Sequence, residues 1–275
     1  MAGVWTVADA AGVLRVPTSA DHKYSRGVLG VRTGSDRYPG AAVLGVEAAW
    51  RTGLGMVRYL GPARATDLVL AARPETVVAA GRVQAWLIGS GTSAADRSDA
   101  DASALRDVLA GDVPVVVDAG ALDLVPGARA SVIVTPHDRE HVVLRQVLGL
   151  PEPGGDRVAA AAETARALGG VVVLKGAVTV VVDADGWSTI VDAGTPWLAT
   201  AGTGDVLGGA VGAVIAASAD RTFPLAAAAA TAVWLHARAA SVAAHSLGPR
   251  GGPITALDVA GLLPVAVAEA LAAQG

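Results

Sequence analysis

Short runs rich in valine, isoleucine and leucine alternate along this chain with alanine-rich stretches. Several of these runs are apolar without interruption, which is typical of parallel strands covered on both faces. Strands that alternate with helices predict an α/β fold, a three-layer αβα sandwich with a mainly parallel central sheet. The expected strands are residues 28–32, 55–60, 85–88, 114–118, 131–135, 171–175 and 179–183.

The alanine-rich stretches predict the helical layers. The expected helices are residues 40–52, 93–109, 139–148, 157–168, 204–218, 224–244 and 256–271. The last two follow one another without a strand, so the C-terminal third is expected to be more helical. Residues 151–156 and 247–253 are too short to act as linkers between domains. We therefore predict a single domain over residues 1–275.

The composition argues against several classes of protein. The chain is 52% hydrophobic and 17% charged, which is too apolar for disorder. A net charge of −4 without a basic run argues against a nucleic-acid partner. The apolar segments 206–217 and 225–235 are shorter than the roughly 18 residues that cross a bilayer, and no signal peptide is expected. The chain has no cysteine, so disulfides are excluded, and a cytoplasmic location is expected.

Lysine is rare in this chain. Of 21 basic residues only Lys23 and Lys175 are lysine, which is a more compact charge than arginine. Chance under a biased codon supply is the alternative explanation for each lysine taken alone. Lys175 ends an apolar run and is followed by Gly176 and Thr179, which predicts a strand–turn–strand tip that presents a cation, amides and a hydroxyl. An exposed hairpin tip without function is the alternative for Lys175. Lys23 lies just before the first expected strand.

Residues 199–209, ATAGTGDVLGG, form the strongest candidate for a ligand site. Two glycines allow the backbone to approach a ligand closely, and a buried apolar helix is expected after them. The free N–H groups of its first turn favour an anion such as phosphate. We interpret Asp205 in that turn as a general base that takes a proton from a hydroxyl attacking phosphorus. A role as helix cap or dipole partner is the alternative for this carboxylate.

Polar residues and glycine turns also follow other expected strands. Asp118 ends one strand, His137 follows the next, and residues 88–93 read IGSGTS. Ligands collect at the carboxyl ends of strands in open α/β sheets. A helix cap is the alternative role for Asp118, and a hydrogen-bonded loop residue is the alternative for His137. The histidine spacings match no metal motif, so no protein-held metal is expected.

The order of the motifs HKYSRG, YPGAA, IGSG, VVVDAGAL, VTPH, VVLKGAVT, AGTGDVLGG and ITALDV resembles that of one family. This family is the ADP/ATP-dependent NAD(P)H-hydrate dehydratases of the ribokinase-like superfamily, and the resemblance runs from about His22 to the C-terminal helix. It implies a ribokinase-like fold and removal of water from the S epimer of hydrated NADH or NADPH. Phosphorylation of the ring hydroxyl by ADP or ATP, with Mg²⁺ on the nucleotide phosphates, would precede loss of phosphate. The products would be NAD(P)H, phosphate, and AMP or ADP.

The resemblance also implies roles for individual residues. Asp205 matches the catalytic or hydrate-binding aspartate. The nucleotide-binding residues would be Lys175, Gly176, Ala177, Val178, Thr179, Gly202, Thr203 and Gly204. The substrate-binding residues would be Ala41, Gly91, His137 and Asp205, with Lys23 and Asp118 expected beside them. A homo-oligomer, possibly a tetramer, is expected from the same resemblance. Only about 21 residues precede His22, so the epimerase domain that many relatives carry is expected on a separate chain.

Three segments depart from the family pattern. The chain reads GSGTS at 89–93 where the family has GPGLG, DAGALD at 118–123 in place of DADALN, and TPHDRE at 135–140 in place of TPHPGE. All three are expected on the side that holds the hydrated dinucleotide. Two alternatives therefore stay open. One is a ribokinase-like kinase for an alcohol such as a vitamin precursor or a sugar, and the other is a nucleotide-binding protein without turnover.

Overall fold

The computed structural model describes residues 2–218 and 223–274. Its strands are β1 (Gly3–Val4), β2 (Val28–Arg32), β3 (Met56–Tyr59), β4 (Ala85–Ile88), β5 (Val115–Val117), β6 (Val132–Val134), β7 (Val171–Leu174), β8 (Val178–Val182) and β9 (Ser188–Asp192). They form one sheet in the order β1-β9-β8-β7-β6-β5-β4-β2-β3. Only β8 runs antiparallel to its neighbours β7 and β9 within the described sheet; the other pairs are parallel.

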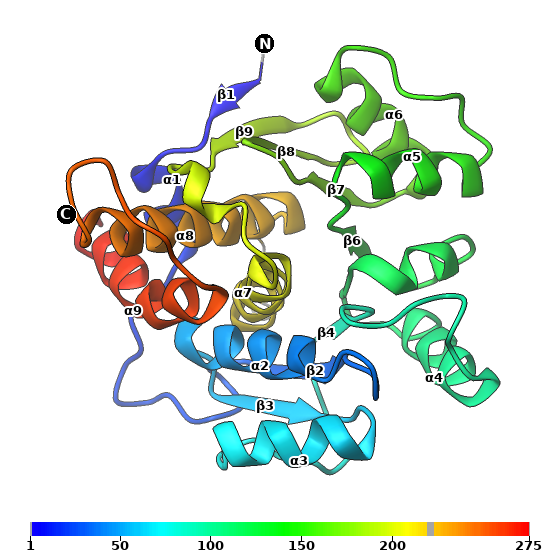
Figure 1. Cartoon of the computed structure of the whole chain (residues 1–275), viewed down its shortest axis with the longest axis horizontal. Coiled ribbons are helices and arrows are strands. Elements are labelled where there is room, and N and C mark those ends of the chain that lie inside the picture. Colours follow the sequence, from blue (N-terminus) through cyan, green and yellow to red (C-terminus); the bar gives the residue numbers. More distant parts are fainter. Residues whose placement is uncertain (1, 219–222, 275) are drawn as a thin grey trace.

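Helices cover both faces of this sheet (Figure 1). They are α1 (Val7–Val13), α2 (Gly40–Thr52), α3 (Ala63–Ala72), α4 (Asp99–Leu109), α5 (Asp138–Val147), α6 (Arg157–Leu168), α7 (Thr203–Ser218), α8 (Leu225–His245) and α9 (Ala256–Ala272), with 3₁₀ turns η1 (Ala119–Leu124) and η2 (Pro196–Leu198). One apolar cluster packs the sheet against α2, α7, α8 and α9. A second packs the other face against α4, α5 and α6. The predicted three-layer α/β sandwich is confirmed.

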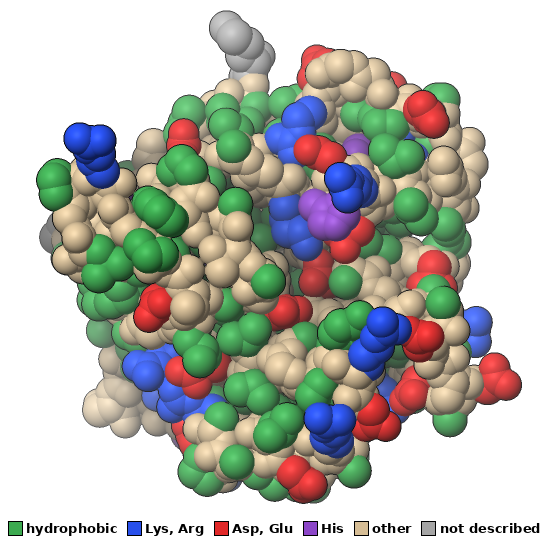
Figure 2. Space-filling model, viewed as in Figure 1, with side chains coloured by type: hydrophobic (Ala, Val, Ile, Leu, Met, Phe, Trp, Pro, Cys, Tyr) green, Lys and Arg blue, Asp and Glu red, His purple; other side chains and the backbone are tan. Residues whose placement is uncertain are grey.

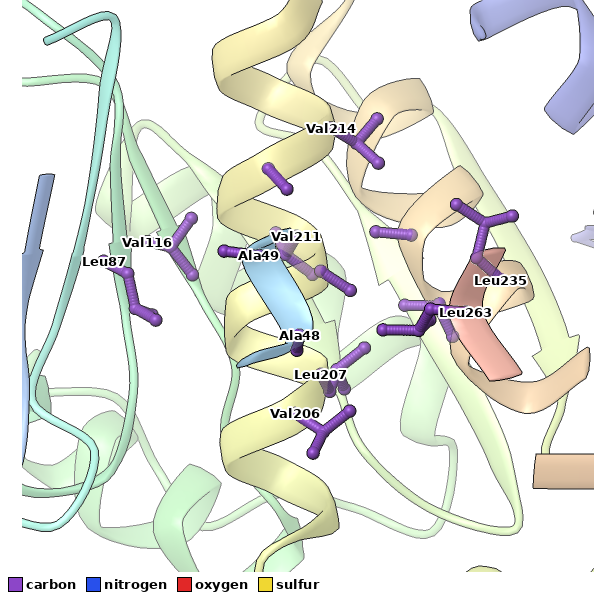
Figure 3. Close-up of a cluster of buried hydrophobic side chains, with 14 of the residues drawn as sticks. Ala48, Ala49, Leu87, Val116, Val206, Leu207, Val211, Val214, Leu235 and Leu263 are labelled. Carbon is purple, nitrogen blue, oxygen red and sulfur yellow. The ribbon is translucent and has the colours of Figure 1, made fainter. Parts of the chain in front are cut away.

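Helix α7 lies at the centre of the larger cluster. Figure 3 shows its side chains Val206, Leu207, Val211 and Val214 among apolar residues from the sheet and from neighbouring helices. It also packs very closely on α2, because a Cβ on Gly209 would lie 2.2 Å from the carbonyl oxygen of Gly45. This packing fixes where the N-terminus of α7 emerges from the core, and the predicted buried helix after the GTGD loop is confirmed.

Helix α8 is longer than the apolar segment seen in the sequence. With 21 residues it is, among the described helices, the one long and apolar enough to cross a bilayer. However, 67% of its most apolar window is buried inside the protein. Burial on this scale is typical of a core helix, and α8 packs on α7 and α9.

The structure differs from the predicted elements in two ways. The helix expected over 93–109 begins only at Asp99, because the Ser98 side chain accepts a hydrogen bond from the Asp101 amide (3.1 Å) and caps it there. The sequence also did not predict β1, β9, α1 or α3. Strand β9 alternates polar and apolar residues at the border of the sheet, and β1 and α1 are only 2 and 7 residues long. Such short or half-polar segments give a weak hydrophobic pattern.

Candidate active site

A pocket of ≈ 880 Å³ opens where the carboxyl ends of the central strands meet the N-terminus of α7. The β7–β8 turn forms one wall and the loop from Asp192 to Gly204 forms another. Figure 2 shows acidic, basic and histidine side chains gathered around the hollow on this face. The predicted residues that line it are His137, Lys175, Gly176, Ala177, Val178, Thr179, Thr203 and Gly204.

The GTGD loop presents the first turn of α7 to this pocket. Gly202 has φ 88°, and a Cβ there would lie 2.6 Å from Leu44 Cδ1, so glycine is required both by conformation and by packing. The Thr203 hydroxyl donates a hydrogen bond to the Thr200 carbonyl oxygen (2.8 Å) and so stabilises the loop. The backbone N–H groups of the first helical turn are therefore held where they suit an anion.

Asp118 is the buried centre of the polar network at the strand ends. Its side chain accepts hydrogen bonds from Ser90 Oγ (2.9 Å), Thr135 Oγ1 (2.7 Å) and Lys175 Nζ (2.8 Å). The residue is only 3% exposed. It makes no side-chain capping bond to η1, so the helix-cap alternative is wrong. Burial of this carboxylate is compensated by three donors, one of them charged.

Lys175 is held beside the N-terminus of α7. Burial opposes its charge, but the nearby carboxylates of Asp118 and Glu140 outweigh this effect and raise its pKa. Its Nζ lies 3.6 Å from Glu140 Oε2, and a Cβ on Gly204 would lie 3.6 Å from the same nitrogen. With a side chain only 19% exposed, Lys175 is no free hairpin tip, and that alternative is wrong. It supplies a fixed positive charge at the pocket.

Asp205 differs from its neighbours because its carboxylate has no partner. No donor in residues 2–218 and 223–274 makes a hydrogen bond to it, and it makes no capping bond. Burial, and then the charge of Asp118, raise its pKa to about 6, although Lys175 acts in the opposite direction. A half-buried carboxylate with a pKa near neutrality is suited to accept a proton during a reaction.

His137 begins α5 and faces the same pocket. Its Nδ1 accepts a hydrogen bond from the Glu140 amide (3.1 Å), while the Glu140 carboxylate accepts one from the His137 amide (2.8 Å). This reciprocal capping box fixes the imidazole at the helix start. The side chain remains 52% exposed, and its Nε2 lies 3.6 Å from Glu140 Oε1.

Three residues in or beside the pocket were not singled out as functional in the sequence. His236 on α8 is buried and its Nε2 donates to the Thr203 carbonyl (2.9 Å), which braces the GTGD loop. Burial lowers its pKa to about 4, although the bond to Thr203 opposes this, so the imidazole is neutral. A polar side chain in an alanine-rich helix needs a buried partner, and that signal could have found it. Glu140 and Arg157 carried no comparable signal, because both stand in polar helix starts.

Ala41 and Gly91 are brought together as predicted, at the N-terminus of α2. A Cβ on Gly91 would lie 2.5 Å from the Ala41 Cβ, and the loop is in the left-handed conformation with φ 67°. One turn later, a Cβ on Gly45 would lie 3.6 Å from the Asp205 carbonyl oxygen. A second pocket of ≈ 530 Å³ opens beside them; its lining includes Arg32, Tyr38, Thr92, Ser93 and Arg97.

Two of the three departures from the family pattern pack on each other beside this second pocket. A Cβ on Gly120 would lie 2.1 Å from the Thr92 carbonyl oxygen, so the glycine at 120 accommodates the GSGTS turn. Arg97 then donates to the Gly120 carbonyl (2.7 Å) and pairs with Asp123. The third departure does not join them. Asp138 lines the larger pocket instead, next to His137.

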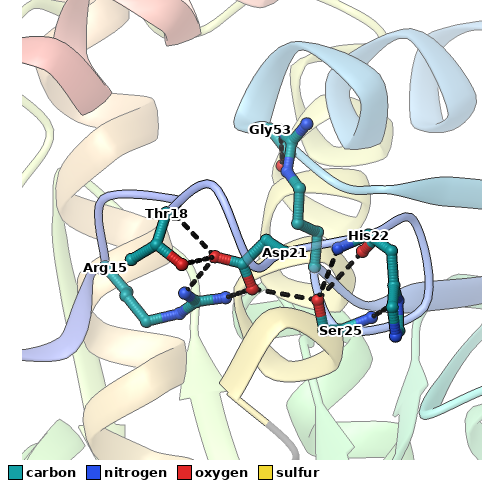
Figure 4. A network of polar contacts seen from close by, with 7 residues as sticks. Arg15, Thr18, Asp21, His22, Ser25 and Gly53 are labelled. Atoms are coloured by element: carbon teal, nitrogen blue, oxygen red, sulfur yellow. Dashed lines mark hydrogen bonds and ion pairs between the residues drawn. The ribbon is translucent and has the colours of Figure 1, made fainter.

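The structure does not bring Lys23 to this site, which corrects its expected place beside the substrate. Its loop precedes β2 and therefore lies at the amino ends of the strands. Gly27 in the same loop packs on Ala216 near the C-terminus of α7, and the 16 residues of α7 span about 24 Å. The loop is closed by its own contacts, including Arg15–Asp21 (2.6 Å) and Ser25–Asp21 (2.9 Å) (Figure 4).

The described residues offer no cluster of three or more His, Asp or Glu side chains that could hold a metal ion. At the larger pocket, Asp118 is committed to Lys175, which leaves Asp205 as the unpartnered carboxylate. These residues fit Mg²⁺ only as a cation that is carried largely by phosphate and water, which is the usual way that nucleotide-bound Mg²⁺ is held.

Comparison with known proteins gives a consistent result. The family model described as NAD(P)H-hydrate dehydratase matches residues 29–258. The chain is 44% identical over 262 residues to the bifunctional NAD(P)H-hydrate repair enzyme of Mycobacterium leprae, covering 90% of this chain and 52% of that protein. It is 33% identical over 262 residues to the ADP-dependent (S)-NAD(P)H-hydrate dehydratase of Neisseria meningitidis, covering 87% of this chain and 85% of that protein.

The solved structures agree. The ADP/ATP-dependent NAD(P)H-hydrate dehydratase of Bacillus subtilis, co-crystallised with ATP and Mg²⁺, superimposes with a TM-score of 0.83 at 28% identity, covering 96% of this chain and 97% of that one. The ribokinase-like fold is thereby confirmed. The chain spans about half the length of the bifunctional relatives that it matches. With its sequence matched over most of its length and its fold matched throughout, this chain belongs to the NAD(P)H-hydrate dehydratase family.

Proposed function

We propose that this chain dehydrates the S epimer of hydrated NADH or NADPH with consumption of ADP or ATP. The observation that carries the proposal is the unpartnered Asp205 carboxylate in the first turn of α7, with the Lys175 cation nearby. A base, a cation and helix-terminal amides at one point are what phosphoryl transfer to a hydroxyl needs. The relatives named above support the choice of substrate.

The larger pocket is assigned to the adenine nucleotide. The turn from Lys175 to Thr179 and the loop from Gly202 to Gly204 would hold the phosphates between the lysine and the amides of α7. The apolar part of the same pocket, which includes Leu207 and Val233, suits the adenine ring. Mg²⁺, carried by the phosphates and water, would neutralise their charge.

The hydrated nicotinamide is assigned to the region of Ala41 and Gly91 at the N-terminus of α2, which packs on α7 near Asp205, with His137 reaching it from the larger pocket. The rest of the dinucleotide would extend into the second pocket. Asp118 is too deeply buried to contact the substrate freely, so we assign it to positioning Lys175.

The chemistry then follows from these positions. Asp205 takes the proton of the ring hydroxyl as that oxygen attacks the terminal phosphorus, and the bond from phosphorus to AMP or ADP breaks. Lys175 and the α7 amides stabilise the charge on the transferred group. The lone pair of the ring nitrogen next expels phosphate, and loss of a ring proton restores the double bond of NAD(P)H.

The test is incubation of the protein with freshly prepared hydrated NADH or NADPH and each nucleotide. We expect the reduced-nicotinamide absorbance to return together with free phosphate, only when ADP or ATP is present. A stable phosphoester without recovered absorbance would instead identify a small-molecule kinase, and nucleotide binding without any product would identify a binding protein.

Three expectations complete the proposal. An epimerase, on this or another polypeptide, would supply the S epimer, since the bifunctional relatives are named as repair enzymes with two activities. A homo-oligomer and a cytoplasmic location are predictions that size-exclusion chromatography with light scattering and cell fractionation would check. One domain over residues 1–275 is the organisation that we propose.

A further inference from the structure

Arg157, at the first position of α6, reaches three separate backbone and side-chain groups of the larger pocket. Its Nη1 donates to the Val178 carbonyl (2.6 Å), and its Nη2 donates to the Lys175 carbonyl (2.8 Å). Its Nε donates to Asp138 Oδ1 (3.0 Å). One guanidinium thus joins both ends of the β7–β8 turn to the start of α5, a geometry that its planar, forked donors permit.

The turn is shaped around this guanidinium. A Cβ on Gly176 would lie 2.7 Å from Arg157 Nη2, so the glycine leaves the room that the arginine fills. The turn also meets α5 at one backbone bond, from the Lys175 amide to the Pro136 carbonyl (2.8 Å), in a short parallel bridge between His137 and Lys175. Together with the ion pair between Lys175 Nζ and Glu140 Oε2 (3.6 Å), Arg157 and this bridge tie the β7–β8 turn to the segment that carries His137.

The partner of Arg157 is one of the residues at which this chain departs from its family pattern. Asp138 stands where a Pro-Gly turn is usual, and its carboxylate contacts the guanidinium. A proline or glycine at 138 could not supply this acceptor. The departure therefore adds a contact at the nucleotide pocket.

We propose that Arg157 is a positioning residue for the nucleotide: it sets the turn from Lys175 to Val178 and, through Asp138, couples that turn to His137. The inference rests on the proposed function, because it assumes that the larger pocket takes ADP or ATP. Arg157 itself does not need to touch a substrate.

The test compares Arg157→Ala, Arg157→Lys and Asp138→Ala with the parent chain. Calorimetry with ATP and with ADP, each with Mg²⁺, gives the nucleotide Kd, and steady-state kinetics give kcat and the KM for the hydrate. For Arg157→Ala we expect the nucleotide Kd to rise about tenfold or more, since two carbonyls lose a charged donor. The kcat at saturating nucleotide should stay within about twofold to threefold, because the reacting groups are intact.

Arg157→Lys is the control for the possibility that Arg157→Ala weakens nucleotide binding only because it destabilises the fold. Lysine keeps the charge, but its single nitrogen cannot reproduce the planar fork that places separate donors at the two carbonyls and the carboxylate. We therefore expect parent-like melting with a nucleotide Kd that is still raised several-fold. Asp138→Ala should raise the Kd less, by about threefold. Because Asp138 acts through Arg157, combining Arg157→Ala with Asp138→Ala should raise the nucleotide Kd no further than Arg157→Ala does alone.

Two results would overturn the inference. One is a nucleotide Kd in both Arg157 variants equal to that of the parent. The other is an equal rise in nucleotide Kd and hydrate KM that follows loss of melting temperature, which would indicate a structural role alone. If the Arg157 pattern appears but no hydrate is turned over, the proposed function fails and the positioning role stands. If the parent binds neither nucleotide, both fall.

Discussion

The two lysines of this chain lie in loops near opposite ends of α7, and hydrogen-bonded charges surround both. At the amino ends of the strands, Arg15 and Asp21 bond to each other within the loop that also carries Lys23. At the carboxyl ends, Asp118 neutralises Lys175, but the nearby Asp205 accepts no hydrogen bond from the described residues. A network that satisfies itself stabilises a loop, whereas a carboxylate left unpartnered beside a cation can act on a ligand.

The largest effect is expected from Asp205→Asn. Asparagine keeps the shape of the side chain but cannot take a proton, so kcat should fall by about 10²–10⁴-fold. Nucleotide affinity should change little, because the amides of α7 and Lys175 remain. Steady-state turnover together with calorimetry checks both statements. A kcat close to that of the parent would remove the functional distinction between the two loops.

Lys175→Ala comes next. Loss of the charge that faces the phosphates is expected to weaken ADP or ATP binding by about 10–100-fold. The substitution also leaves Asp118 buried without its cation, so the matched control is Lys175→Ala combined with Asp118→Asn. Binding that stays weak in the double variant would assign the loss to the lysine. A parent-like Kd in Lys175→Ala would show that the turn faces away from the nucleotide.

The pH dependence of kcat/KM should also identify Asp205 as the group that acts at the carboxyl ends of the strands. Because Asp205 must be ionised to act as a base and its pKa is about 6, kcat/KM should fall about tenfold per pH unit below pH 6. A flat profile between pH 5 and 7 would contradict the assignment of the base.

The same carboxylate has a consequence for stability. Between the ordinary value of 3.8 and about 6, the folded protein binds more protons at Asp205 than the unfolded chain does, so stability falls as the pH rises through this window. Above about pH 6 the carboxylate is ionised in both states, so its destabilising effect on the fold no longer changes with pH. Asp205→Asn should therefore raise the free energy of unfolding by about 1–3 kcal/mol at pH 8 but not at pH 4. Denaturant melts at both pH values check this, and an unchanged stability at pH 8 would count against a buried, unpartnered carboxylate.

The smallest effects are expected at the other end of α7. Lys23→Ala should leave kcat, hydrate KM and nucleotide Kd within about twofold, since its Nζ lies 5.3 Å from the Tyr24 ring and far from the pocket. Asp21→Asn should lower the melting temperature slightly, because Arg15, Thr18 and Ser25 lose a charged acceptor, with activity unchanged. A clear loss of affinity in Lys23→Ala would show that this loop takes part in binding after all.

The sequence was informative wherever the signal is local. Uninterrupted valine runs and alanine-rich stretches gave the bounds of β2, β4, α2 and α6 as the structure has them. Glycines marked the GTGD loop and the β7–β8 turn, and a Cβ on Gly202 or Gly176 would lie only 2.6 Å from Leu44 or 2.7 Å from Arg157. Strand direction could also have excluded Lys23: a residue that precedes a strand lies at its amino end, and only the family resemblance placed it at the site.

By itself, then, the sequence determined the α/β fold, because hydrophobic periodicity acts over a few neighbouring residues, and the order of its motifs indicated the family. Its glycines marked two loops that we propose to hold the ligand. Only the tertiary structure decided which polar groups meet. Lys175 finds Asp118 across 57 residues, His236 finds Thr203 across 33, and Arg157 finds Val178 across 21. Buried polar groups take their partners from whatever the packing of the sheet and helices brings within about 3 Å, and no local pattern records that choice.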